Sequence, residues 1–213
     1  MKAVIFTHGH GDHTGGAAVF VNGAEPQIWA RSNYGSEQSP LNTAKLTIQR
    51  KRGVRQAGFA LPMTMRINNG VAPAQRPQPG RSAFESNTVV KPTHFFDGDS
   101  KAIEVAGIRL ELYAAPGETD DQLYVWYPGK KILFAGDNFY RSFPNLYAIR
   151  GTPYRNVKAW ADSVDQMLKH KPEAVVPGHT HPFLGSEKVE EVLTDYRDAI
   201  RFVHDKTVEG MNK

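Results

Sequence analysis

The chain has 213 residues, of which 40% are hydrophobic and 23% are charged, and its formal net charge at pH 7 is +4. These values are typical of a soluble globular protein of one domain, residues 1–213, with a substantial core. The absence of cysteine excludes disulfides, thiolate metal ligands and a cysteine nucleophile. We expect no membrane span, because no apolar run is long enough. We find no signal-peptide pattern at the first residues and assign no compartment.

The first predicted strand, residues 3–6, leads directly into the motif THGHGDH at residues 7–13. Three of the eight histidines and one aspartate lie within positions 8–13 of this motif. A His-x-His pattern in an extended segment points both imidazoles to the same side. Imidazole nitrogens and a carboxylate suit zinc or a similar borderline metal. A histidine-rich surface loop without a metal is the alternative, and the dense spacing at the end of a strand favours metal binding.

The region after this motif carries weaker signals. A short helix is predicted near Gly15 and a strand at residues 27–30, and residues 36–52 have helical potential that Pro40 weakens. Residues 53–91 are rich in Gly, Pro, Asn and Gln, and we interpret them as a flap loop over the site.

Basic residues are concentrated in residues 45–55. Such a strip could contact nucleic acid or an anionic substrate. A solvated helix face is the favoured interpretation, because no nucleic-acid-binding module accompanies the strip. We therefore predict no nucleic-acid partner.

The second half of the chain alternates strand and helix patterns. Hairpin turns are predicted at residues 105–108 and 127–130, and a final helix is predicted at residues 186–209. A further helix is predicted at residues 156–168. The predicted strands are residues 102–105, 109–114, 122–126, 131–135 and 174–176. Together these elements predict an α+β fold in which helices cover two sheets, an αββα sandwich.

Three further loops could complete the metal site. Each follows a predicted strand and places one possible ligand beside a glycine: Glu118, Asp137 and His179. Taken singly these are weak signals, since a Gly-Asp turn is usually structural. Four such loops in succession are a much stronger indication of a metal centre.

The pattern His8-x-His10-x-Asp12-His13, followed by these three ligands, resembles the metallo-β-lactamase superfamily. Most members have a histidine at the position of Glu118. The zinc-dependent alkylsulfatases, which cleave sulfate esters of alkyl alcohols such as dodecyl sulfate, carry a carboxylate there. Residues 145–151 (NLYAIRG) are similar to a segment that holds the sulfate group in that branch, and residues 197–212 resemble its helix after the core. In contrast, Asp137 stands where these sulfatases usually have glutamate.

The resemblance implies a dizinc centre. It assigns His8, His10 and Glu118 to one zinc, Asp12, His13 and His179 to the other, and Asp137 as a bridge. It also implies catalytic roles for Asp12, Asp137, Asn145 and Arg150. Two divalent ions would face three carboxylates. We therefore expect the metal-bound water to be less acidic and the hydroxide formed from it to be more nucleophilic.

The implied substrate is a small anionic amphiphile, an alkyl sulfate. Arg150 suits paired hydrogen bonds to sulfate oxygens, and Asn145 and Tyr147 could add an amide and a hydroxyl. Five phenylalanines near the site loops could line a channel for the alkyl chain, although packing in the core is favoured for each: Phe95, Phe96, Phe139, Phe143 and Phe183. His181 is left open as an orienting residue, a general acid or a loop residue, and structural or surface roles are favoured for the remaining histidines, His94, His170 and His204.

Several alternatives stay open at the level of sequence. The same fold could hydrolyse another ester, a lactone or a β-lactam, although Glu118 and residues 145–151 favour sulfate esters. We also expect the chain to be a catalytic core, lacking strands that precede the metal motif and domains that follow the core in relatives. An inactive core and a homodimer are both compatible with this. The sequence does not distinguish S–O from C–O cleavage or fix the preferred alcohol.

Overall fold

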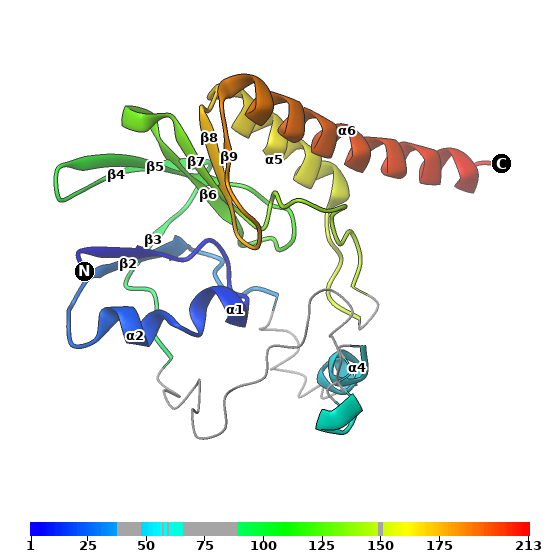
Figure 1. Ribbon diagram of the computed structural model, residues 1–213, viewed down its shortest axis with the longest axis horizontal. Coiled ribbons are helices and arrows are strands. Elements are labelled where there is room, and N and C mark those ends of the chain that lie inside the picture. Colours follow the sequence, from blue (N-terminus) through cyan, green and yellow to red (C-terminus); the bar gives the residue numbers. More distant parts are fainter. Residues whose placement is uncertain (38–47, 57, 59, 66–88, 149–150) are drawn as a thin grey trace.

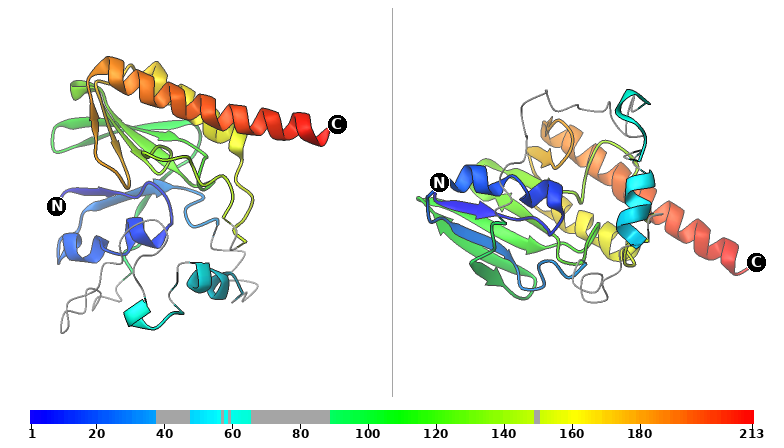
Figure 2. Two further views of the ribbon diagram at one scale, coloured as in Figure 1. Left: turned by 45° about the vertical axis from the view of Figure 1, so that its right-hand side comes forward. Right: turned by 90° about the horizontal axis from the view of Figure 1, so that it is seen from below.

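Two sheets lie face to face, and helices cover the outer side of each (Figures 1 and 2). This computed structural model describes residues 1–37, 48–56, 58, 60–65, 89–148 and 151–213. The arrangement is the predicted αββα sandwich.

The smaller sheet is parallel, with strand order β1 (Ala3–Ile5), β2 (Gln27–Arg31) and β3 (His94–Phe96). Two short helices, α1 (Gly11–Thr14) and α2 (Ala17–Val21), lie on its outer side (Figure 1). Ala17 of α2 packs there against the buried residues Phe6, Ile28 and Ala30.

The larger sheet has six strands in sequence order, and all neighbours are antiparallel except the parallel pair β7 and β8. Its strands are β4 (Ser100–Val105), β5 (Ile108–Ala114), β6 (Leu123–Tyr127), β7 (Ile132–Gly136), β8 (Ala174–Pro177) and β9 (Phe183–Leu184). A 3-10 turn, η2 (Pro128–Lys130), joins β6 to β7. The long helices α5 (Val157–Lys169) and α6 (Ser186–Met211) cover its outer face (Figure 2).

Strand β6 shows why the sandwich needs both layers. Leu123 and Val125 point into the core between the sheets, whereas Tyr124 and Trp126 point toward the helices, and all four are buried. Successive side chains of a strand face opposite sides, so a strand buried on both faces requires cover on both. Trp160 of α5 is fully buried in the outer core.

Most predicted elements of the second half are confirmed within two residues. The hairpin turn between β4 and β5 places Ala106 and Gly107 at φ 52° and 76°, the conformation that a two-residue hairpin requires. Strands β3 and β9 were not predicted. The short helix predicted to start near Gly15 is α2, whereas α1, which ends just before Gly15, was not predicted.

The region between β2 and β3 differs more from expectation. Residues 36–37 are in a turn, and α4 (Ile48–Gln56) continues through Gly53, so the predicted helix 36–52 and the start of the predicted flap 53–91 were wrong in their bounds. A short turn of 3-10 helix, η1, follows at Met63–Met65. Residues 38–47 and 66–88, including Lys45 of the basic strip, lie outside the described residues.

Lys51, Arg52 and Arg55 are exposed on α4, as a solvated helix face predicts. None of the helices in the described part of the chain is both long and apolar enough to cross a membrane.

The start of α5 offers a test of local helix stability. The Asn156 side chain caps the helix by accepting a hydrogen bond from the Ala159 backbone N–H at 3.0 Å. We expect Asn156→Ala to lower the free energy of unfolding by about 1 kcal/mol, and Asn156→Asp, which keeps the acceptor, to change it little. Urea denaturation of both variants measures this, and equal losses would contradict the capping role.

Candidate metal centre

The predicted ligands converge because their loops leave the two sheets at one edge. His8 and His10 follow β1, and α1 carries Asp12 and His13. Glu118, Asp137 and His179 follow β5, β7 and β8, three strands that run in the same direction. A backbone hydrogen bond from Leu123 N–H to the Thr7 carbonyl, at 2.8 Å, joins the two sheets beside the site.

One group of possible metal ligands consists of His8, His10 and Asp137, whose ligand atoms lie within 4.8 Å of one another. His8 is fully buried, and its Nδ1 lies 3.1 Å from Thr7 Oγ1. Its Nε2 lies 3.9 Å from Asp137 Oδ2 and has no hydrogen-bonding partner among the described residues. A buried nitrogen without a partner is costly, and a lone pair aimed at a metal site explains it.

A second group consists of Asp12, His13 and His179, within the same limit of 4.8 Å. Asp137 Oδ2 lies 3.1 Å from the Nε2 atoms of both His13 and His179. Asp12 Oδ2 lies 3.5 Å from His13 Nε2 and 3.3 Å from His179 Nε2. Asp137 therefore contacts both groups, as the bridging role predicted for it requires.

The chemistry of the histidines also fits a metal. Burial, together with the nearby His13 and His10, lowers the pKa of His8 to about 3, so this imidazole is neutral at pH 7. Burial lowers the pKa of His13 as well, but its hydrogen bond to Asp137 outweighs burial and raises that pKa overall. Neutral His8 offers a lone pair directly, whereas a metal at His13 would compete with a proton that the Asp137 carboxylate helps to hold.

Two glycines allow this close approach. A Cβ atom on Gly178 would lie 2.3 Å from Asp137 Oδ1 and 2.9 Å from His13 Cε1. Gly136 has φ +55°, and a Cβ atom there would lie 3.0 Å from Cβ of Thr7. The glycines beside Asp137 and His179 are thus required by packing around the ligands.

Glu118 lies at the edge of the first group rather than within it. Its Oε1 is 4.0 Å from His10 Nδ1 and 3.0 Å from the Arg155 guanidinium, whose side chain is almost fully buried. Burial raises the pKa of Glu118, and the Arg155 charge opposes this shift. The charge that Glu118 adds to the site is therefore partly balanced by the protein itself, which the sequence interpretation did not include.

Arg155 also reaches the predicted sulfate-binding segment. Its guanidinium donates a hydrogen bond to the Asn145 carbonyl, and the Asn145 N–H donates to the Tyr140 hydroxyl at 2.8 Å. Asn145 and Tyr147 are both exposed on the loop between β7 and α5. Arg150 lies outside the described residues.

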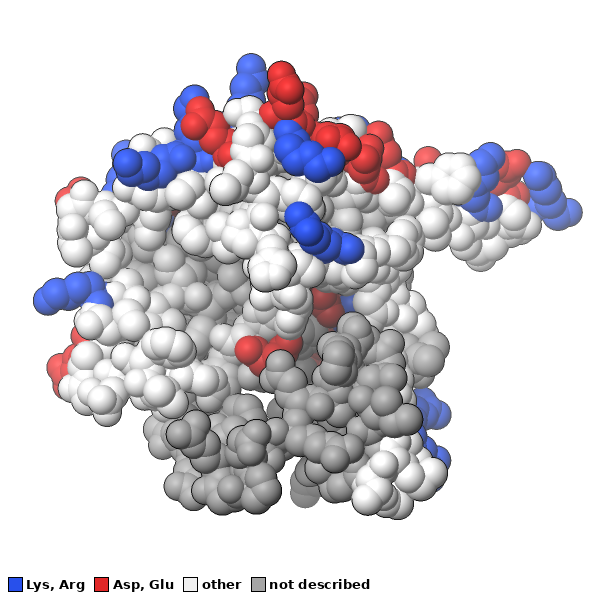
Figure 3. Space-filling model, in the orientation of Figure 1, with Lys and Arg blue, Asp and Glu red and all other residues white. Residues whose placement is uncertain are grey.

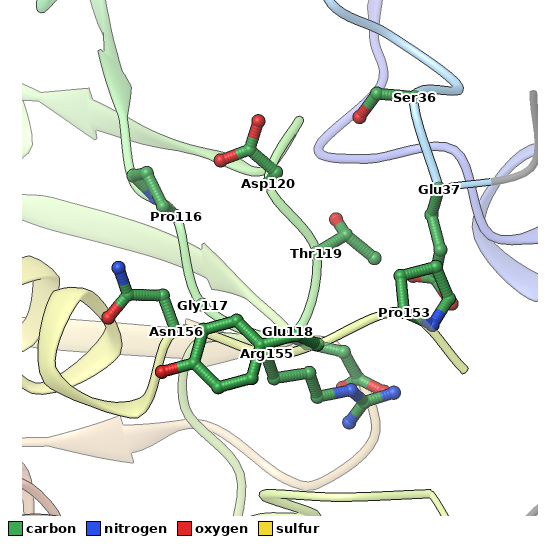
Figure 4. A pocket seen from close by; sticks show the side chains of 11 residues that line it. Ser36, Glu37, Pro116, Gly117, Glu118, Thr119, Asp120, Pro153, Arg155 and Asn156 are labelled. Atoms are coloured by element: carbon green, nitrogen blue, oxygen red, sulfur yellow. The ribbon is translucent and has the colours of Figure 1, made fainter. Parts of the chain in front are cut away.

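Sequence reasoning missed two charged residues, Glu37 and Arg155. Both line a cavity of about 370 Å³ beside Glu118 (Figure 4). Glu37 Oε2 lies 3.1 Å from His10 Nε2. No local motif marks either residue, because their partners are far away in the sequence. In the orientation of Figure 1, the space-filling view shows acidic side chains within a recess of the molecular surface (Figure 3).

The other aromatic and histidine candidates divide between core and surface. Phe96 packs between the sheets, whereas Phe95 is exposed. Phe139, Phe143 and Phe183 line one groove of about 430 Å³ together with Tyr140 and residues of α6.

His170 has a structural role, since its Nε2 lies 2.9 Å from the Tyr124 hydroxyl and its ring stacks on Trp126. His94 Nδ1 lies 2.8 Å from Thr93 Oγ1, and its ring packs on Trp29. His204 Nδ1 lies 2.9 Å from Asp205 Oδ1 near the end of α6. His181 is exposed in the loop after His179.

Comparison with known proteins identifies the family of the chain. Residues 1–179 match the profile of the metallo-beta-lactamase superfamily. The whole chain is 31% identical to a linear primary-alkylsulfatase from Pseudomonas sp. and 27% identical to an (R)-specific secondary-alkylsulfatase from Pseudomonas sp.. It spans 40% and 33% of these two relatives.

Solved structures of alkylsulfatases and of metallo-beta-lactamase family proteins share the fold of this chain. The stereoselective inverting sec-alkylsulfatase Pisa1 from Pseudomonas sp. superposes with a TM-score of 0.81 at 26% identity, over 99% of this chain and 34% of that one. A metallo-beta-lactamase family protein from Thermus thermophilus shares the fold, with a TM-score of 0.59 at 18% identity over 99% of this chain and 62% of its own. The chain therefore belongs to the metallo-beta-lactamase superfamily, where its similarity places it with the alkylsulfatase branch.

Proposed function

We propose that this chain is the catalytic core of a dizinc hydrolase that cleaves alkyl sulfates to alcohol and sulfate. The observation that carries the proposal is the pair of ligand groups that share Asp137, together with Glu118 at the edge of the first group. Similarity to alkylsulfatases over the full chain supports the substrate class.

The residues present fit two zinc ions. His8, His10 and Glu118 would hold one ion, Asp12, His13 and His179 the other, and Asp137 would contact both. Nitrogen and oxygen ligands of this kind are typical of zinc. When bound, the ions would lower the pKa of a water molecule and stabilise negative charge on the sulfate.

The protein's own groups would orient the ester. Arg150, whose position in the similar segment supports this role, would bind two sulfate oxygens with its planar guanidinium. Asn145 and Tyr147 would add donors. Arg155, through its contacts with Glu118 and the Asn145 carbonyl, supports a fixed distance between this segment and the metal ligands.

The groove of Phe139, Phe143 and Phe183 is our candidate for the alkyl chain. Its wall includes Tyr140, whose hydroxyl accepts the Asn145 N–H, so the groove adjoins the proposed sulfate-binding segment. An apolar chain with a charged head group needs this combination of an apolar wall next to polar donors.

The decisive experiment measures sulfate release from dodecyl sulfate. We expect zinc-dependent release that a chelator abolishes and added zinc restores. A parallel panel of a lactone, a β-lactam and a phosphodiester serves as the control for substrate class. Zinc binding without hydrolysis of dodecyl sulfate would contradict the proposed activity, and hydrolysis of a panel member in its place would reassign the substrate.

Arg150→Ala tests the sulfate-binding role separately. Loss of a charge-assisted donor pair should lower kcat/KM for dodecyl sulfate on the order of 100-fold while zinc content stays unchanged. Arg109→Ala is the matched control, because Arg109 is an exposed arginine on β5 that forms an ion pair with Glu111. Equal kinetics of the two variants would remove Arg150 from the site.

Gly178→Ala tests the packing of the metal ligands. Its Cβ would overlap Asp137 Oδ1, so the carboxylate must move and zinc affinity should fall about tenfold or more. Gly210→Ala, in α6 with open space around it, is the control. Chelator competition measures both affinities, and an unchanged value for Gly178→Ala would show that Asp137 is not needed in this position.

A further inference from the structure

Glu37 forms a close pair with a predicted metal ligand from outside the motif loops. Its Oε2 lies 3.1 Å from His10 Nε2, and the two side chains are only 9% and 13% exposed. Glu37 and Glu118 both line the cavity shown in Figure 4. A carboxylate this close to a partly buried imidazole favours the proton on the ring nitrogen that it faces.

The two nitrogens of His10 face different partners. Nε2 faces Glu37, whereas Nδ1 lies 4.0 Å from Glu118 Oε1. In a neutral imidazole one nitrogen carries the proton and the other a lone pair. An Nε2–H that donates to Glu37 leaves the lone pair on Nδ1, toward the other predicted ligand of the same ion.

His8 has the opposite arrangement. Its Nδ1 lies beside Thr7 Oγ1, and its Nε2 faces Asp137. The two histidines of the His-x-His motif therefore present different nitrogens to the site. The nitrogen that faces away from the site has an oxygen partner in each case, Thr7 Oγ1 for His8 and Glu37 Oε2 for His10. Proteins usually orient metal-binding histidines in this way.

The turn that carries Glu37 is fixed to the loop of Glu118. The Gly35 N–H donates to Asp121 Oδ2 at 2.7 Å, and the Thr119 hydroxyl donates to Asp121 Oδ1 at 2.6 Å. By accepting both hydrogen bonds, the buried carboxylate of Asp121 joins the two segments. Gly9 permits the contact from the other side, since a Cβ atom there would lie 3.1 Å from the Gly35 Cα.

We propose that Glu37 is a positioning residue of the metal centre, which accepts the Nε2–H of His10 and thereby directs Nδ1 to the metal. Direct ligation by Glu37 to the same ion is disfavoured, because Glu37 faces the nitrogen of His10 that is turned away from Glu118. The inference rests on the proposed metal centre but not on the identity of the substrate.

Long-range ¹H–¹⁵N NMR spectra of the zinc-loaded chain read the protonated nitrogen of His10 directly. We expect the proton on Nε2 and zinc on Nδ1. This measurement uses the unaltered protein, so it does not depend on whether a variant folds. Zinc on Nε2 of His10 would overturn the proposal.

Zinc affinity provides the second readout, by chelator competition. We expect Glu37→Ala to bind zinc roughly 10- to 100-fold more weakly. Glu37→Gln should lose less, because its amide oxygen still accepts a hydrogen bond. Glu25→Ala, an exposed glutamate between α2 and β2, is the matched control and should leave the affinity unchanged. Thermal melting of each metal-free variant monitors folding.

The outcomes separate this inference from the metal centre itself. Failure of the unaltered chain to bind zinc would overturn both. Zinc binding with equal affinity in Glu37→Ala would overturn the role of Glu37 alone, and so would an equal loss of affinity in Glu25→Ala.

Discussion

The site depends on the interaction of the Asp137 carboxylate with three histidine side chains. One of its oxygens lies 3.1 Å from two imidazole nitrogens and 3.9 Å from a third, and these belong to loops of both sheets. Burial alone would raise the pKa of Asp137, but the hydrogen bond and charge of His13 and the neighbouring histidines lower it overall. The carboxylate therefore stays ionised while buried, which gives the site a fixed negative centre around which histidines collect. His8 Nε2, which has no hydrogen-bonding partner in the described part of the chain, faces this carboxylate, and a Cβ atom on Gly178 would overlap it.

Charged side chains surround this carboxylate at different distances from the histidines. Asp12, Asp137 and Glu118 lie among the histidines, and Glu37 lies behind His10. Arg155 supplies one buried positive charge beside Glu118. Four carboxylates and one guanidinium leave an excess of negative charge, which suits divalent cations. Bound divalent cations would offset this excess of negative charge, which would otherwise repel the anionic ester that we propose as substrate.

The sequence was sufficient for most of the larger sheet and for naming the candidate ligands that the structure brings together. These candidates could be named because each lies in a short motif at a strand end, and the strands β4 to β8 were found because their apolar patterns are separated by clear turns. Strand β9 has only two residues, and β3 has three that begin with a histidine and so lack the continuous apolar run that marks β1. Glu37 and Arg155 were missed for a different reason. Their partners, His10 and Glu118, are far away in the sequence, and only the packing of Gly9 against Gly35 and the start of α5 brings them together.

Arg155 gives the carboxylate at position 118 a structural meaning beyond its charge. A buried guanidinium without a carboxylate partner is strongly destabilising, so a histidine at this position would leave Arg155 without its ion pair. The buried Arg155 side chain therefore requires the carboxylate of Glu118 as its ion-pair partner. The same guanidinium donates to the Asn145 carbonyl, and this links the metal ligand to the segment that we assign to the sulfate group. The glutamate at residue 118 thus couples the candidate metal centre to the proposed sulfate-binding segment through the single buried side chain of Arg155.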